Sequence, residues 1–242
     1  MVRIDGRQPN ELRPLSFDLD VQRHAGGSCV VSLGDTSVLC AVTVEEQVPR
    51  WMRGTGRGWL TAEYSMLPAA TNTRSNRERV LSAGRTKEIQ RLIGRSLRAA
   101  VNLEALGERT FNIDCDVLNA DGGTRTAAIT GAFVAVSRAI GTLAYDRSPI
   151  VSAVAAVSVG IRDGELLVDL NYEEDSSADV DCNIVGLASG GLVEVQGTAE
   201  GETFTPEQLS QMVEAAQTAL QDMLAAQQHV LLSPRSAGGD VP

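Results

Sequence analysis

The apolar residues of this chain fall into two successive sets of short alternating runs, and each set is followed by a segment with helical spacing. Residues 15–45 contain three runs with a period of two, separated by turns that contain glycine. Residues 150–199 contain a second group of such runs. Alternation of this kind is typical of strands with one buried face. Because grouped strands followed by helices differ from the regular strand–helix alternation of a doubly wound sheet, the order predicts an α/β sandwich with two similar halves.

Between these two sets of strands, helical spacing marks residues 86–106 and 125–145. A strand is expected at residues 110–118, directly before the second of these helices. Residues 46–80 show neither period and are rich in glycine, arginine, threonine and asparagine. A segment of this length exceeds an ordinary connection, so it is predicted to be an irregular loop that is functional or mobile.

The last helix has a well-defined start. Thr205 is a suitable N-cap, Pro206 fits the first helical position, and Gln208 completes a capping box. The helix is expected to run to about residue 230. We therefore predict one compact domain over residues 1–232 and a disordered tail over residues 233–242, which are rich in small residues.

The apolar residues also indicate where the protein resides. The chain has no uninterrupted apolar run of about 18 residues, the length that a membrane-spanning helix requires. Its first residues, "MVRIDGRQPNELRP", are polar and lack the apolar core of a signal peptide. These features predict a cytoplasmic protein with no membrane partner.

The cysteines and histidines do not suggest a metal centre. No cysteine pair has the CxxC spacing, and each cysteine lies in a strand-like apolar run, which favours buried free thiols over zinc ligands or disulfides. The two histidines have no partner at ligand spacing. These residues are Cys29, Cys40, Cys115, Cys182, His24 and His229.

Positive charge is concentrated in one part of an acidic chain. The formal net charge is −10, which argues against general nucleic-acid binding. Residues 50–98, however, carry eleven basic side chains against three acids, and all of the basic residues except Lys87 are arginines. Arginine's planar fork suits phosphate groups, so this window predicts a localised polyanion site. The alternative is that some of these arginines pair with acids of another subunit.

The stretch Asn119–Ala127, "NADGGTRTA", joins the expected strand to the second helix. Its glycines allow close backbone approach, and the start of the helix adds free N–H groups and the positive end of its dipole. Thr124, Thr126 and Arg125 add hydroxyls and a guanidinium. The stretch lacks the Walker A pattern. It predicts an anion site, and the alternative is a plain strand-to-helix connection with a threonine N-cap.

Three aspartates, Asp175, Asp179 and Asp181, cluster between two strand-like runs. If residues 176–180 form a hairpin loop, Asp175 and Asp181 become cross-strand neighbours at roughly 5 Å. Two carboxylates that close suit a Mg²⁺ ion, or they share a proton for general acid catalysis. The alternative is a solvated acidic turn.

The segment "GRTKEIQRLIGRSLR" combines an apolar face with arginines. Arg85 precedes the expected helix at the end where an anion is favoured, so it is a candidate anion ligand. For Arg91, Arg95 and Arg98 the simpler interpretation is the polar face of an amphipathic helix.

Five segments resemble successive motifs of the ribonuclease PH family of bacterial phosphorolytic 3′→5′ exoribonucleases: "GWLTAEYSMLP", "GRTKEIQRLIGRSLRA", "DCDVLNADGGTRTAAITGA", "EDSSADVDCNIV" and "EVQGTAEGETFT". The resemblance runs in order from about residue 3 to 230. It implies an α/β two-layer sandwich like the second domain of ribosomal protein S5, assembled as a homohexamer, a trimer of dimers. It also implies trimming of RNA 3′ ends, notably of tRNA precursors, with inorganic phosphate as nucleophile, reversible release of nucleoside diphosphates, and Mg²⁺ as cofactor.

The resemblance implies roles for individual residues. It places phosphate ligands at Arg85, Gly123, Thr124 and Arg125, and catalytic, magnesium-associated aspartates at Asp175 and Asp181. Asp179 lies where related phosphorylases also have an acid. Arginines that guide RNA correspond to the loop containing Arg53, Arg57, Arg74, Arg77 and Arg79.

Two other classes of function remain as alternatives. One is a non-catalytic RNA-binding ring subunit of exosome type, which typically lacks the phosphate turn or the aspartates; this sequence has both. The other is a hydrolytic nuclease or a nucleotide-binding enzyme on a related fold. Activating water commonly requires several carboxylates around two metals or a positioned base. Phosphate is already an anion, so the few acids here fit phosphorolysis better.

Overall fold

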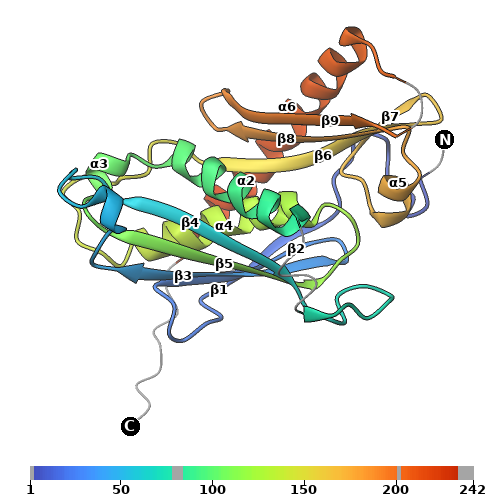
Figure 1. Ribbon diagram of the computed structural model, residues 1–242. Coiled ribbons are helices and arrows are strands. Elements are labelled where there is room, and N and C mark those ends of the chain that lie inside the picture. Colours follow the sequence, from blue (N-terminus) through green and yellow to red (C-terminus); the bar gives the residue numbers. More distant parts are fainter. Residues whose placement is uncertain (1–2, 78–83, 201–202, 234–242) are drawn as a thin grey trace.

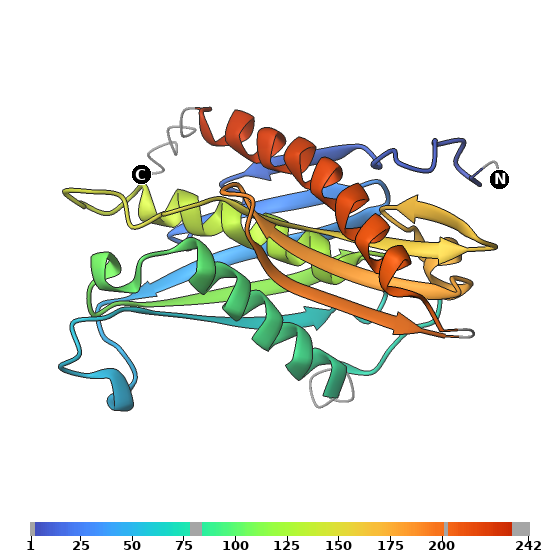
Figure 2. The same cartoon turned by 90° about the horizontal axis from the view of Figure 1, so that it is seen from above.

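The structure is a computed structural model that describes residues 3–77, 84–200 and 203–233. Its elements form four layers: a five-stranded sheet, two central helices, a four-stranded sheet and a long C-terminal helix (Figures 1 and 2). Each half of the chain packs a sheet on a helix that follows it in sequence. The predicted α/β sandwich with two related halves is confirmed, and the two halves are stacked on each other.

The first sheet has the strand order β1-β2-β3-β5-β4, and all neighbours are antiparallel except β4 and β5. Strand β4 lies within the segment expected to be irregular, so that part of the prediction is wrong. Leu60, Ala62 and Tyr64 alternate inward along β4, but the glycines and arginines on either side hide this short pattern. The strands are β1 (Leu15–Leu19), β2 (Gly27–Leu33), β3 (Thr36–Glu45), β4 (Trp59–Met66) and β5 (Thr110–Asn119), and the 3-10 turn η1 (Arg50–Met52) precedes β4.

The central layer contains α2 (Gly84–Ala100) and α4 (Thr124–Ile140). Nearly every residue of α4 is buried, because sheets cover it on both sides. The helix expected to extend to residue 106 is interrupted after α2. Val101 there forms a β-bridge, and the Asn102 side chain accepts hydrogen bonds that start the short helix α3 (Leu103–Leu106).

The second sheet has the order β7-β6-β8-β9 and is antiparallel throughout. Strand β6 is buried on both faces: Val154 and Ala156 face the first core, whereas Val157 and Val159 face α6. The elements of this half are β6 (Val154–Arg162), β7 (Glu165–Val168), α5 (Tyr172–Ser176), β8 (Val180–Leu187), β9 (Leu192–Ala199) and α6 (Pro206–Leu231).

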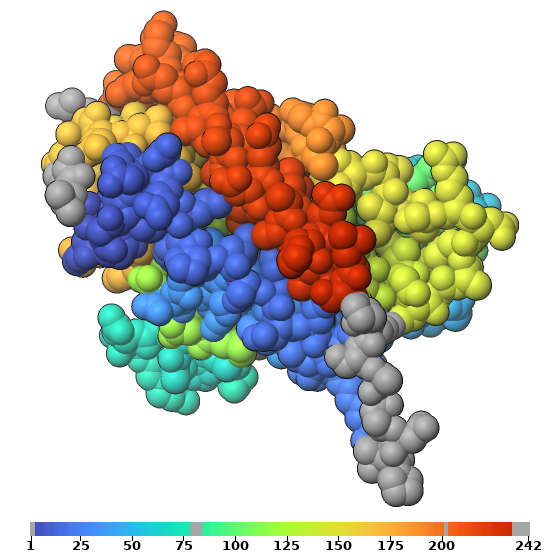
Figure 3. All heavy atoms as spheres, turned by 180° about the vertical axis from the view of Figure 1, so that it is seen from behind, coloured from blue at the N-terminus to red at the C-terminus, as the bar shows by residue number. Residues whose placement is uncertain are grey.

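Helix α6 crosses the back of the molecule beside the N-terminal residues (Figure 3). The capping box predicted at its start is confirmed: the Thr205 side chain accepts a hydrogen bond from the Gln208 backbone N–H, and the Gln208 side-chain oxygen accepts one from the Thr205 backbone N–H. The boundary at residue 232 stays a prediction, and most of the expected tail lies outside the described residues. In the described ranges, no helix combines the length and the apolar character needed to cross a bilayer. All four cysteines are free and buried, as predicted.

Candidate functional site

The turn between β5 and α4 has the backbone geometry of a close-approach site. Gly122 and Gly123 have φ angles of 72° and 64°, a left-handed backbone conformation that residues with a Cβ rarely adopt. A Cβ at Gly122 would lie 2.6 Å from the carbonyl oxygen of Leu170. The turn is therefore pressed against the chain that leads from β7 into α5, and glycine is required for that contact.

One cleft of about 660 Å³ opens at this turn. It brings together residues from both halves of the chain that the sequence singled out separately. Its lining also includes residues that the sequence analysis did not identify, among them Thr71, Ser158, Asn183 and Glu200. The sequence-predicted residues in its wall are Arg85, Gly123, Thr124, Arg125, Asp175 and Asp181.

The two aspartates reach the cleft from different elements. Asp175 lies in α5, which Asn171 caps through a capping box with Glu174, and Asp181 is the second residue of β8. The hairpin considered for residues 176–180 does not form, because local capping makes a helical turn where a strand was expected. Asp175 and Asp181 nevertheless both line the same cleft.

Burial and charge act in opposite directions on these aspartates. Burial raises the pKa of Asp175, and the positive charges of Arg85 and Arg125 partly offset this rise. For Asp181, burial and then the negative charge of Asp175 raise the pKa to about 6, against the pull of Arg125 and Arg85. The cleft therefore places two arginines opposite two acids, and Asp181 resists ionisation.

Neighbouring side chains hold the residues of the turn in place. The Tyr64 hydroxyl donates a hydrogen bond of 2.8 Å to the hydroxyl of Thr124, and burial raises the pKa of Tyr64. The Arg125 guanidinium donates to Gln196 at 3.0 Å and to Glu88 at 3.5 Å. The sequence analysis missed Tyr64 and Gln196, although the inward alternation of β4 was a signal for Tyr64.

The loop arginines do not form one cluster. Arg53 and Arg57 are exposed before β4, whereas Arg74 and Arg77 are exposed after it. Strand β4, which has eight residues and is about 25 Å long, lies between the two groups along the chain. Met66 at the end of β4 and Thr71 after it line the cleft, so among the described loop arginines Arg74 and Arg77 follow the end of β4 that is nearer the cleft. Arg79 lies outside the described residues.

Asp179 is not part of the cleft lining. Its side chain is exposed and accepts a hydrogen bond from the backbone N–H of Asp163. Arg91 and Arg95 are exposed on α2, as the amphipathic interpretation predicts, and Arg95 pairs with Glu194. Arg98 instead stacks over the ring of Trp59 at 4.5 Å.

Comparisons with known proteins agree with this architecture. Models of the 3′ exoribonuclease family match residues 11–141 (domain 1) and 152–219 (domain 2). The ribonuclease PH of Mycobacterium avium is 54% identical over 239 residues, which cover 96% of this chain and 92% of the relative. Rice (Oryza sativa) Rrp46 superposes with a TM-score of 0.78 at 22% identity, over 95% of this chain and 100% of Rrp46. An Archaeoglobus fulgidus exosome chain, solved with RNA bound to the active site, gives 0.78 at 23% identity and covers 91% of both chains.

The two solved structures are too distant in sequence to indicate more than the fold. The family models and the close relative span nearly all of the chain, including the turn, both aspartates and Arg85. The chain therefore belongs to the 3′ exoribonuclease family and, within it, to the ribonuclease PH type, a phosphorolytic 3′→5′ exoribonuclease.

Proposed function

We propose that the cleft binds inorganic phosphate between Arg85 and the turn Gly123–Arg125, beside the last phosphodiester of an RNA 3′ end. An oxygen of the bound phosphate forms a bond to the phosphorus of that diester. The bond from this phosphorus to the 3′ oxygen of the preceding nucleotide breaks, and that oxygen takes up a proton. The products are a nucleoside 5′-diphosphate and an RNA shortened by one nucleotide, and the same steps run in reverse.

The observation that carries this proposal is the convergence of two arginines, a glycine turn at a helix start and two carboxylates on one cleft. Attack by one anion on another requires relief of repulsion and in-line positioning. Arg85, Arg125 and the first N–H groups of α4 supply positive charge for the attacking phosphate. Thr124, held by Tyr64, adds a hydroxyl at a fixed position.

Magnesium fits the acidic side of the cleft. Mg²⁺ binds through one or two carboxylates and leaves its other positions to water and substrate phosphate. Asp175 and Asp181 provide such a pair; no larger group of potential ligands occurs in the part of the chain that the structure describes. When bound, the ion neutralises charge on the transferring phosphoryl group. In the alternative role, a protonated aspartate gives its proton to the leaving 3′ oxygen.

The wider setting of the reaction is also part of the proposal. Its substrates are single-stranded RNA 3′ ends, with tRNA precursors foremost, guided by loop arginines. The enzyme works in the cytoplasm as a homohexamer, a trimer of dimers. The strong resemblance to ribonuclease PH supports these features, and light scattering would detect six chains of 25.7 kDa.

A phosphate-dependence assay tests the proposed chemistry. We expect purified protein with RNA, Mg²⁺ and phosphate to release nucleoside diphosphates, and to release nothing when phosphate is omitted. Arg125→Ala should lower kcat/KM for phosphate by about 10²–10³-fold while RNA affinity stays nearly constant. Arg91→Ala, an exposed arginine outside the cleft, is the matched control. Release of monophosphates would exclude phosphorolysis, and equal losses of phosphate use and RNA affinity would remove Arg125 from the phosphate site.

A further inference from the structure

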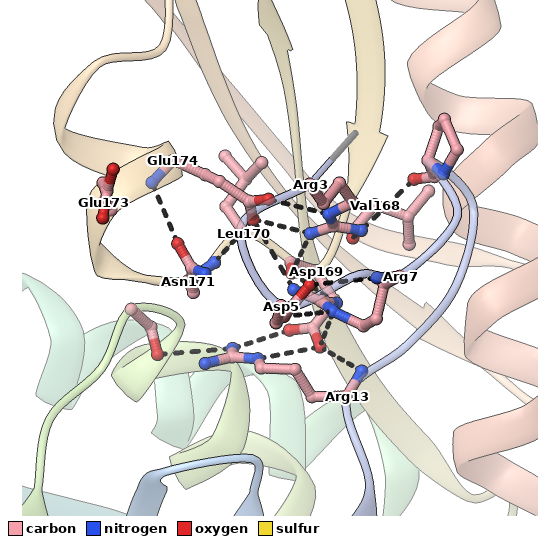
Figure 4. A network of polar contacts seen from close by, with 12 residues as sticks. Arg3, Asp5, Arg7, Arg13, Val168, Asp169, Leu170, Asn171, Glu173 and Glu174 are labelled. Atoms are coloured by element: carbon pink, nitrogen blue, oxygen red, sulfur yellow. Dashed lines mark hydrogen bonds and ion pairs between the residues drawn. The ribbon is translucent and has the colours of Figure 1, made fainter. Parts of the chain in front are cut away.

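Three arginines of the N-terminal segment are buried, although the cleft does not use them. Arg3, Arg7 and Arg13 are only 4%, 9% and 4% exposed. The segment lies along the surface beside α6 (Figure 3), but these side chains point inward to two acids (Figure 4). Those acids, Asp169 and Glu174, are 0% and 1% exposed. Buried charges are expensive unless they are paired, so this cluster requires an explanation beyond surface solubility.

Arg13 reaches the phosphate turn. Its Nε and Nη2 donate to the Asp169 carboxylate at 3.0 and 2.7 Å, which fixes the plane of the guanidinium. Its remaining donors point at the backbone carbonyl oxygens of Asp121 and Gly122. These two residues directly precede Gly123, and a Cβ at Gly123 would lie 3.1 Å from Arg13 Nη2. One arginine therefore ties the anion-binding turn to the strand end at Asp169.

Arg3 reaches the helix that carries Asp175. Its Nε and Nη2 donate to the two carboxylate oxygens of Glu174 at 2.7 and 2.6 Å. Its Nη groups also donate to the carbonyl oxygens of Val168 and Asp169 at 2.8 and 2.9 Å. Glu174 precedes Asp175 in α5 and accepts the Asn171 backbone N–H that completes the cap. The start of α5 is thus fixed by the same segment that fixes the turn.

Asp169 is the residue where the two attachments meet. It adopts a φ angle of 56°, in the left-handed region that few residues other than glycine, asparagine and aspartate adopt. Its carboxylate also accepts the Arg13 backbone N–H at 2.8 Å. The turn and α5 are additionally joined by a hydrogen bond of 3.2 Å from the Tyr172 N–H to the Asp121 carboxylate. The network thus links the two walls of the cleft without lining it.

We propose that Arg13 and Asp169, together with Arg3 and Glu174, are positioning residues that set the phosphate turn at its working distance from Asp175. This inference rests on the proposed phosphate site. None of the four lines the cleft, so they act through the turn and through α5. A displacement of about 1 Å in a reacting group costs as much as 10²-fold in rate, so a rigid tie between the two walls has a catalytic consequence.

Arg→Lys variants separate positioning from stability, because lysine keeps the charge but cannot make the forked contacts. Arg13→Lys should retain a contact to Asp169 and lose the carbonyl contacts to the turn. We expect it to raise KM for phosphate by about tenfold with RNA affinity unchanged, at a temperature where the variant is folded. Arg3→Lys should instead lower kcat and leave KM for phosphate nearly constant, because it loosens α5. If Arg13→Lys does not fold, Arg3→Lys still tests the same network.

Arg138→Lys is the matched control for the loss of a buried arginine. Arg138 is 9% exposed, pairs with Asp20 and lies near the other end of α4, away from the cleft. The Arg138→Lys variant should lower Tm and leave kcat and KM for phosphate unchanged. If Arg13→Lys or Arg3→Lys lowers Tm with unaltered kinetics, the network is purely structural and the inference is overturned.

Arg125→Ala, assayed in parallel, distinguishes the inference from the function on which it rests. If Arg125→Ala raises KM for phosphate and Arg13→Lys does not, only the positioning role fails. If neither variant changes phosphate use, the phosphate site itself is misassigned, and the inference falls with it.

Discussion

Asp181 can act as a magnesium ligand or as a proton donor, and these roles have opposite pH dependence. Burial and the charge of Asp175 raise its pKa to about 6. A ligand must be ionised, so kcat would rise as pH increases through this value, whereas a donor must be protonated, so kcat would fall. We expect the rising limb, with a midpoint that moves lower as Mg²⁺ increases, because the ion competes with the proton. A pH series of kcat at saturating substrates measures this, and a falling limb would assign the donor role.

The same carboxyl should destabilise the folded protein near neutral pH. Because its folded pKa of about 6 exceeds the ordinary value of 3.8, the folded state binds more protons between these values. The free energy of unfolding therefore falls as pH rises through this interval. Above the folded pKa the destabilisation is complete and no longer changes with pH. Asp181→Asn should raise the free energy of unfolding by about 1–2 kcal/mol at pH 7.5 without Mg²⁺, with no gain near pH 4.

Urea unfolding at the two pH values measures this gain. Asp179→Asn is the control, because that side chain is exposed and outside the cleft; its effect should stay within about 0.5 kcal/mol. If Asp181→Asn raises the free energy of unfolding equally at both pH values, the ionised carboxylate of Asp181 does not destabilise the folded state.

At the scale of elements, β4 separates two groups of arginines that the sequence placed in one loop. Arg77 follows β4 on the cleft side, and Arg57 precedes it at the opposite end. For a short single-stranded oligonucleotide bound in the cleft, Arg77→Ala should weaken binding and reduce the slope of log K against log salt by about 0.7. Arg57→Ala should leave that slope unchanged. Titrations at several salt concentrations check this, and equal effects of both variants would exclude a cleft-side path for the RNA.

Elements with strong local signals were predictable. The α4 start lies within one residue of its expected position, because two glycines and a following buried run mark it, and α6 begins at its capping box. Strand β4 was missed because its alternation is short and its neighbours are rich in glycine and arginine. Helix α5 was missed because Asn171 and Glu174 cap only five residues, too few for helical periodicity.

The sequence indicated several of the residues that line the cleft, but not the geometry that brings them together. The chemistry of Arg125 and the aspartates is visible in the sequence, and the family resemblance assigns them roles. Nothing local to the turn indicates that Gly122 touches Leu170, since that contact depends on how the two sheets stack. The arginines of the N-terminal segment were overlooked for the same reason: a polar sequence does not reveal that its charges are buried against Asp169.

At the scale of the whole molecule, the cleft exists only where the two halves meet. Gly123 and Arg125 belong to the first half, and Asp175 and Asp181 to the second. Helix α4 lies between the sheets, and α6 covers the outer face of the second sheet. Any substitution that loosens the packing of these layers should therefore alter the geometry of the cleft as well as the stability of the protein.

Gln227 of α6 connects these layers directly. Fully buried, it donates to the carbonyl oxygens of Thr130 in α4 and Val154 in β6, at 2.9 and 3.0 Å. Gln227→Ala should lower the free energy of unfolding by about 2–4 kcal/mol, because it removes both bonds and leaves a cavity. Gln208→Ala, which weakens only the cap of the same helix, should cost about 0.5–1 kcal/mol. Urea unfolding, followed by circular dichroism and by tryptophan fluorescence, tests this.

Coincident transitions in the two signals would show that the two halves unfold together. If Gln227→Ala lowers the free energy of unfolding no more than Gln208→Ala does, Gln227 does not connect the layers.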